Sequence, residues 1–172
     1  MPTMEDHPSM EERFRAVGAD YLGSFLSRIE ASVVRLSEAQ VWWRPNPAAN
    51  SVGNHLLHLQ GNLSQWVLAG LGGVRYERHR RHEFDAQGAP HRQELLDGTR
   101  QVVERCQAVI LALPAGKLLE PRCTQGCATD GIHTVIHVVE HTSYHTGQIL
   151  QIVKELLGPE AQIEFFPEHR NE

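Results

Sequence analysis

The sequence predicts an all-α protein, a four-helix bundle with long connecting loops. Apolar residues recur in steps of three and four over four segments, and polar or Gly/Pro-rich stretches separate these segments. This period places apolar side chains on one face of an α-helix, and no convincing pair of strand patterns competes with it. Four amphipathic helices of roughly 20 residues are the parts of a four-helix bundle. Residues 1–172 are therefore expected to form a single domain.

The first two helices are expected over residues 10–36 and 51–71, where the apolar period is clearest. Ser9 is suited to cap the first helix, because its hydroxyl can accept a hydrogen bond from a free backbone N–H of the first turn. Asn50 or Ser51 can cap the second helix in the same way.

Two prolines separate these helices. Pro45 and Pro47 exclude helix and force an extended connection. Trp42 and Trp43 come just before them, and we expect the Trp pair to bury its rings against one end of the bundle rather than to contact a ligand.

The third helix is expected over residues 93–113 and the fourth from the cap residue Asp130 to Leu157. Gly158-Pro159 follows, a common signal for the end of a helix. The connections over residues 73–92 and 115–129 are expected to be loops.

Two further stretches carry an expectation. The basic run RYERHRRH, from Arg75 to His82, is short and interrupted by an acid, so we expect a solvated loop rather than a phosphate-binding patch. Phe165 and Phe166, near the C-terminus, are expected to pack against the bundle.

The composition excludes some classes of partner. Hydrophobic residues make up 41% of the chain and charged residues 22%, with a net charge of -5. This acidic balance does not favour nucleic acid as a partner, and no stretch has the length of a membrane span. No signal peptide is evident, so a cytoplasmic location is expected.

The three cysteines are expected to be reduced thiols. Cys106, Cys123 and Cys127 are an odd number in a chain without an export signal. CTQGC does not have the spacing of a CxxC site, and no second pair completes a four-thiolate zinc site.

The strongest chemical signal is a run of histidines in the expected fourth helix. His133, His137, His141 and His145 follow one another at intervals of four residues. Each interval turns about 40° around the helix, so the first and last differ by about 120° and cannot serve one ion. Any neighbouring pair can hold a divalent metal, and spacing alone does not choose the pair.

A third ligand can come from the expected second helix, which carries His55 and His58. A catalytic metal typically has three protein ligands and keeps a position open for water or substrate. A single helical histidine is usually structural, but four in register with a pair elsewhere favour a metal site.

The segments NSVGNHLLHLQGNLSQWVLAG and HTVIHVVEHTSYHTGQIL resemble the DinB-like superfamily. The resemblance implies a four-helix bundle in which one histidine of the second helix and two residues of the fourth bind a divalent metal. By position these are His58, His141 and His145. His55 and His133 are then extra.

Three residues near these histidines are candidates for other roles. His137, one turn before His141, is placed to act beside the metal or on the substrate side. Tyr144 can reach the site as a donor or belong to the core, and Gln148 can orient His145 or bond another helix.

The resemblance also implies a chemistry. It favours a thiol S-transferase in detoxification or stress response, with a small-molecule substrate and a low-molecular-weight thiol such as bacillithiol or mycothiol as cosubstrate. The ligands suit Zn or Ni. The alternatives are a metal-dependent hydrolase and a non-catalytic metal-binding or interaction protein. A homodimer is expected, because the family often forms one.

Overall fold

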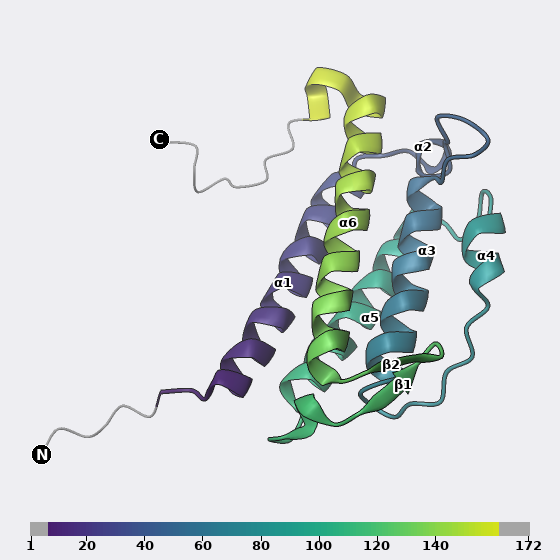
Figure 1. Ribbon diagram of the computed structural model, residues 1–172. Coiled ribbons are helices and arrows are strands. Elements are labelled where there is room, and N and C mark those ends of the chain that lie inside the picture. Colours follow the sequence, from purple (N-terminus) through teal and green to yellow (C-terminus); the bar gives the residue numbers. More distant parts are fainter. Residues whose placement is uncertain (1–6, 162–172) are drawn as a thin grey trace, which may run out of the picture.

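Four long helices form the body of the protein in the computed structural model, which describes residues 7–161 (Figure 1). Helices α1 and α3 each pack against both α5 and α6, so the four make a closed bundle and confirm the predicted fold class. The long helices are α1 Met10–Val33, α3 Val52–Leu63, α5 Arg92–Leu111 and α6 Gly131–Leu157; the short elements are α2 Glu38–Val41, the π-helix η1 Ser64–Ala69, α4 Arg80–Asp85, η2 Lys117–Leu119, η3 Gly158–Ala161 and the strands β1 Arg122–Thr124 and β2 Cys127–Thr129.

The helix starts follow from local hydrogen bonding. The hydroxyls of Ser9 and Ser51 accept from the backbone at the third helical position, and the side chain at that position returns a bond to the cap, in α1 and α3 respectively. The Asp130 carboxylate accepts from the His133 amide at the start of α6. Gly158 ends α6 with a φ of 55°, which costs a glycine little.

Among residues 7–161, the bundle core consists of two apolar clusters, one near each end. Both are built from the faces that the helical period predicted. One cluster includes Leu22, Leu63, Val67, Val103, Cys106, Ile110, Val135 and Val138; the other includes Ile29, Val33, Leu36, Leu56, Leu59, Leu95, Ile149 and Val153.

The Trp pair divides between core and surface. Trp42 lies over Gly53, where an added Cβ would come within 2.8 Å of two of its ring atoms. Its ring therefore packs against the start of α3, as expected. Trp43 is 37% exposed, so the expectation was wrong for this residue.

We expect Gly53→Val to destabilise the fold by about 1–3 kcal/mol, because the new side chain displaces the Trp42 ring from a packed position. The measurement is the free energy of unfolding in urea. Gly147→Ala is the control: a Cβ at Gly147 meets nothing within 4 Å, and alanine favours helix, so its stability should be unchanged or slightly higher. Equal midpoints for the parent and Gly53→Val would contradict the packing argument.

Both long connections contain regular structure that the sequence pattern did not indicate. Residues 73–92 include helix α4, and residues 115–129 include an antiparallel hairpin in which Arg122 pairs with Thr129 and Thr124 with Cys127. The expectation of two loops was wrong at these positions. Their apolar content is too low to produce a period, and contacts with the bundle stabilise them instead.

Phe165 and Phe166 lie outside the described residues, so their packing against the bundle stays a prediction. Within the described part of the chain, no helix combines the length and apolar character needed to cross a bilayer.

Candidate metal centre

Three histidines from two facing helices meet near the middle of the bundle. Helix α3 supplies His58, and α6 supplies His141 and His145 from successive turns. One nitrogen from each ring can be chosen so that all three lie within 4.8 Å of one another. His58 and His145 are buried and His141 is half-buried. The structure thus brings together the three residues that the resemblance indicated.

The donor set fits a divalent metal. The Nε2 atoms of His58 and His141 are 3.0 Å apart. Two nitrogens bound at about 2.1 Å to one ion, at an angle near 90°, would lie about 3.0 Å from each other. The three histidines could therefore hold a metal ion, with Nε2 as the coordinating atom of His58 and of His141.

Burial keeps two of these rings neutral, as ligands must be. It is the largest cause that lowers the pKa of His141 to about 3, with repulsion from His145 and His58 adding to it. Burial and repulsion from His58 lower the pKa of His145 to about 4, while Gln148 acts in the opposite direction. At neutral pH both rings keep a free lone pair for a metal.

His58 has a buried carboxylate behind it. The Glu83 Oε2 atom lies 2.9 Å from Nδ1 of His58. Nη2 of Arg78 lies 3.1 Å from the same Nδ1 atom, but the Glu83 contact is the shorter one. If Nδ1 donates its proton to Glu83, the lone pair of Nε2 is directed toward His141 and a metal. A carboxylate behind a ligating histidine fixes its tautomer and orientation, and no local sequence pattern indicated this one.

Arg78 completes this arrangement. Its guanidinium donates two hydrogen bonds to the Glu83 carboxylate, at 2.6 and 2.7 Å. Burial acts to raise the pKa of Glu83, but the hydrogen bonds from His58 and Arg78 outweigh it and hold the pKa below its usual value. The Arg78 side chain is 5% exposed, so the expectation of a solvated basic run was wrong for this residue.

The strap, which we define as residues 74–91 between η1 and α5, is attached to the bundle by Asn54. This fully buried side chain donates from Nδ2 to the carbonyls of Glu83 and Ala86, at 3.0 and 3.1 Å. Arg44 donates to the Phe84 carbonyl and to the Asn54 side chain, both at 2.9 Å. These bonds hold Glu83 in register with His58.

Gly61 makes room for Glu83. It lies one turn after His58 in α3, and a Cβ there would be 2.1 Å from Oε1 of Glu83 and 3.0 Å from Nε of Arg78. Only glycine lets the ion pair approach the helix this closely.

His55 occupies a comparable position behind His145. Their Nδ1 atoms are 3.1 Å apart, and both rings are buried. One nitrogen must carry the proton; if it is Nδ1 of His145, the Nε2 atom of His145 is free for a metal. The sequence left His55 as an extra histidine, whereas the structure places it against a candidate ligand.

The remaining candidates occupy different positions. His133 is exposed and outside the cluster. His137 is half-buried, with its ring centroid 5.4 Å from that of His141. The Tyr144 ring lies nearly perpendicular to the His145 ring, with centroids 5.2 Å apart, but the residue is 59% exposed, so the alternative of a core position is wrong. Gln148 is half-buried and close enough to His145 to act on its pKa, but among the described residues its Oε1 has no partner at hydrogen-bond geometry.

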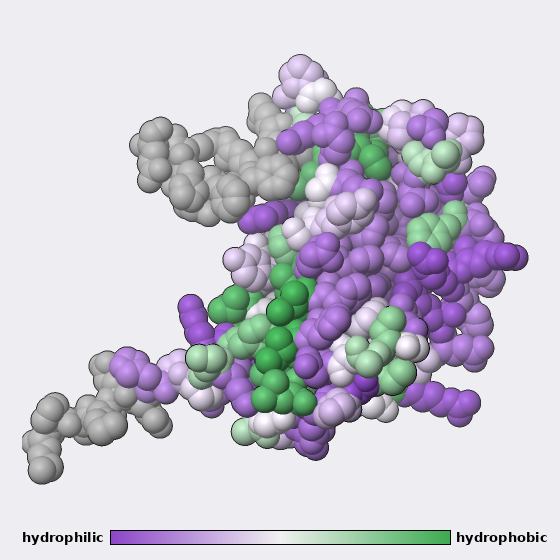
Figure 2. All heavy atoms as spheres, in the orientation of Figure 1, coloured by the Kyte–Doolittle hydropathy of each residue, from purple (hydrophilic) through white to green (hydrophobic). Residues whose placement is uncertain are grey.

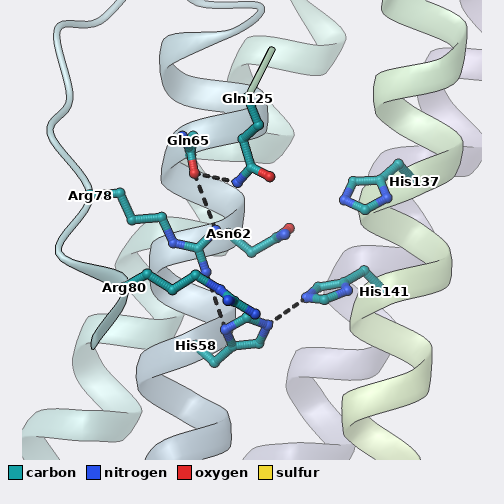
Figure 3. Close-up of a pocket in the computed structure, with 8 residues that line it drawn as sticks. All are labelled: His58, Asn62, Gln65, Arg78, Arg80, Gln125, His137 and His141. Atoms are coloured by element: carbon teal, nitrogen blue, oxygen red, sulfur yellow. Dashed lines mark hydrogen bonds between the residues drawn. The ribbon is translucent and has the colours of Figure 1, made fainter. Parts of the chain in front are cut away.

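A cavity of about 510 Å³ opens beside the cluster (Figure 3). His58 and His141 form part of its wall, so a ligand in the cavity can reach a metal at the cluster. The other lining residues come from α3, η1, the strap, the hairpin and α6; they are Asn62, Gln65, Arg78, Arg80, Gln125 and His137.

The cysteines are not part of this cluster. All three are free; Cys106 is buried and Cys123 and Cys127 are exposed. Burial raises the pKa of the Cys106 thiol to about 12, so it is not a thiolate at neutral pH.

The metal-free protein is expected to lose stability in acid. Burial, with repulsion from His145 and His58, lowers the pKa of His55 from 6.5 to about 4 in the folded state. Below pH 6.5 the unfolded chain therefore binds the proton more strongly, and stability falls as the pH drops toward 4. The loss from this residue approaches about 3 kcal/mol.

Urea unfolding of the metal-free protein between neutral pH and about pH 4 checks this expectation. His55→Gln should make the loss smaller, while His133→Gln, at an exposed position, should leave the profile unchanged. An unfolding free energy that is constant over this range would contradict the assignment.

A four-helix bundle with three clustered histidines on facing helices defines a class, the helical-bundle proteins with a candidate divalent-metal site. Within that class, the chain belongs to the DinB superfamily, whose sequence model matches residues 24–149, more than half of the chain. The matched region includes His58, His141 and His145, and it confirms the resemblance seen in the sequence.

A solved structure agrees with this assignment at the level of the fold. It is that of a DinB-like protein from Bacillus cereus ATCC 10987, with a TM-score of 0.64 and 14% sequence identity, covering 84% of this chain and 91% of that chain. No curated protein matches this chain.

Proposed function

We propose that this protein is a metal-dependent thiol S-transferase acting in detoxification or stress response. The observation that carries the proposal is the cluster of His58, His141 and His145 beside an open cavity. A divalent ion held by these residues, Zn or Ni, would supply Lewis acidity that lowers the pKa of a bound thiol. The cosubstrate is a low-molecular-weight thiol.

The cavity favours a catalytic metal site over a site in which protein ligands fill every coordination position. It reaches two of the three histidines, so a small molecule can approach without unfolding the bundle. His55, which could have closed the site as a fourth ligand, has its Nδ1 atom 3.1 Å from Nδ1 of His145. Three ligands and an open side are typical of catalytic metals.

His137 is our candidate for the group that accepts the thiol proton. Its ring lines the cavity, and its buried Nε2 has no hydrogen-bond partner among the described residues. In the transfer, sulfur forms a bond to an electrophilic carbon, and the leaving group departs with the electrons of the broken bond. A neutral imidazole within the cavity can take the proton that sulfur loses.

Product analysis tests this function. The purified protein, kept from chelators and nickel columns, is first analysed for its metal, and about one ion per chain is expected. It is then incubated with an electrophile such as monochlorobimane, with and without a low-molecular-weight thiol. Turnover that requires the thiol and depends on the metal supports transfer.

Two outcomes contradict the transferase. Hydrolysis of ester or amide substrates without any thiol would favour the hydrolase alternative at the same site. A protein that neither contains nor takes up metal would leave the histidines with a structural role and favour the interaction protein.

We also propose a homodimer, paired through the face shared by α1 and α6. An apolar groove of about 400 Å³ lies there, and Figure 2 shows apolar residues gathered where the two helices run side by side. Tyr21 and Ile136 line the groove and are 53% and 56% exposed. Light scattering measures the mass in solution, and a monomer would contradict the proposal.

A further inference from the structure

The cavity beside the histidine cluster has a polar wall opposite His141 that the candidate metal ligands do not explain. Its volume of about 510 Å³ suits a small molecule. The wall combines two arginines of the strap with amide side chains of α3, η1 and the hairpin (Figure 3). The charge of each arginine and the hydrogen bonding of each amide indicate what this wall can bind.

Arg80 supplies the positive charge that is available to a ligand. Arg78 is neutralised by its two hydrogen bonds to Glu83. Arg80 has no ion-pair partner among the described residues; its guanidinium lies 5.1 Å from the centroid of the Phe84 ring. Figure 3 shows both arginine side chains extending from the strap toward His58. An oxyanion in the cavity can therefore pair with Arg80 without competing with a protein carboxylate.

Asn62 supplies a hydrogen-bonding group that is buried and unused. The residue is 4% exposed and lines the cavity, and its Oδ1 has no hydrogen-bond partner among the described residues. A buried polar atom without a partner destabilises the protein, because it has lost its hydrogen bonds to water. A ligand N–H or O–H that bonds to this oxygen removes the cost, so the position favours a polar ligand over an apolar one.

We propose that the cavity binds a carboxylate-bearing small molecule, with the carboxylate on Arg80 and an adjacent amide or hydroxyl group on Asn62. The inference rests on the proposed function, because it names the substrate class of the same site. Neither Arg80 nor Asn62 is a candidate metal ligand. Binding of the carboxylate can therefore be tested separately from binding of the metal.

The probe is N-acetyl-L-alaninate, which has a carboxylate next to an amide and carries no thiol. Its dissociation constant is measured by ligand-observed NMR on the full chain, metal-loaded and metal-free, beside the uncharged analogue N-acetyl-L-alaninamide. We expect Arg80→Gln to weaken binding of the carboxylate about tenfold, because a charge-assisted bond is lost. Asn62→Asp should weaken it at least as much, by placing a negative charge in the wall.

Arg81→Gln is the matched control, since Arg81 is the next residue, is exposed and does not line the cavity. It should bind the probe like the parent. Metal content and circular dichroism of Arg80→Gln, Asn62→Asp and Arg81→Gln should equal those of the parent, which shows that the fold and the metal site are intact in these three variants.

Four results would overturn the inference. The first is equal affinity for the carboxylate and the amide probe, and the second is an equal loss of affinity in Arg80→Gln and Arg81→Gln. The third is binding that Arg80→Gln retains but His141→Ala loses, and the fourth is tighter binding of inorganic phosphate than of the carboxylate. The third would mean that the probe binds the metal alone. Absence of metal from the parent would instead contradict the proposed function, and Arg80-dependent binding to the metal-free protein would still support the carboxylate site.

Discussion

Replacing His141 with alanine is expected to lower metal affinity by more than about a hundredfold, while the helical fold is retained. Zinc sites with four ligands bind with about 10–16 kcal/mol, so one ligand corresponds to roughly 3 kcal/mol. The fold should tolerate the change because His141 is half-buried and its hydrogen bond is to another candidate ligand, His58. Elemental analysis and titration with Zn or Ni measure the loss.

His133→Ala is the matched control, because this histidine lies on the same helix, is exposed and does not belong to the cluster. It should keep about one ion per chain. Thermal unfolding gives an independent reading, since a metal that binds the native state raises the melting temperature of the parent and of the control. Stoichiometric metal retained by His141→Ala would reject the assigned ligand set.

Glu83→Gln is expected to reduce metal affinity about 10- to 100-fold and to destabilise the protein by about 3–5 kcal/mol. The affinity falls because an amide N–H facing Nδ1 of His58 favours the tautomer whose Nε2 carries the proton. The stability falls because the Arg78 guanidinium, 5% exposed, loses its buried carboxylate. Metal titration measures the first effect and urea unfolding of the metal-free protein measures the second.

Glu77→Gln removes one negative charge from the same strap at an exposed position and should change neither quantity. Because it matches the change in net charge, it separates the local contact from a general electrostatic effect. Parent-like metal affinity in a folded Glu83→Gln protein would show that Glu83 does not orient His58.

Much of the bundle could be predicted from the sequence because the apolar residues of a helix's buried face recur every three or four positions. The start of α6 after the cap residue Asp130 and its end before Gly158 also follow from residues within one turn of each boundary. Residues 64–69 of the predicted second helix form the π-helix η1, which the apolar period did not distinguish from an α-helix. Local signals therefore predicted where each long helix lies, but not that one of them continues as a π-helix.

The strap and the hairpin could not be predicted in this way. Helix α4 has six residues, and each strand has three. Segments of this length are not stable alone, and their apolar content gives no period. The strap is held by bonds from Asn54 and Arg44 on other segments, which depend on the path of the chain in space.

The sequence by itself determined the helical class and placed His141 and His145 on one face, because helical spacing is a local property. Spacing offered six histidines on two helices, and the resemblance to a family selected His58, His141 and His145 from them. Only the tertiary structure brought Glu83 behind His58 and His55 against His145, since these contacts join residues 25 and 90 positions apart. Side chains from separate elements meet only when the bundle closes, and no local pattern records which of them will touch.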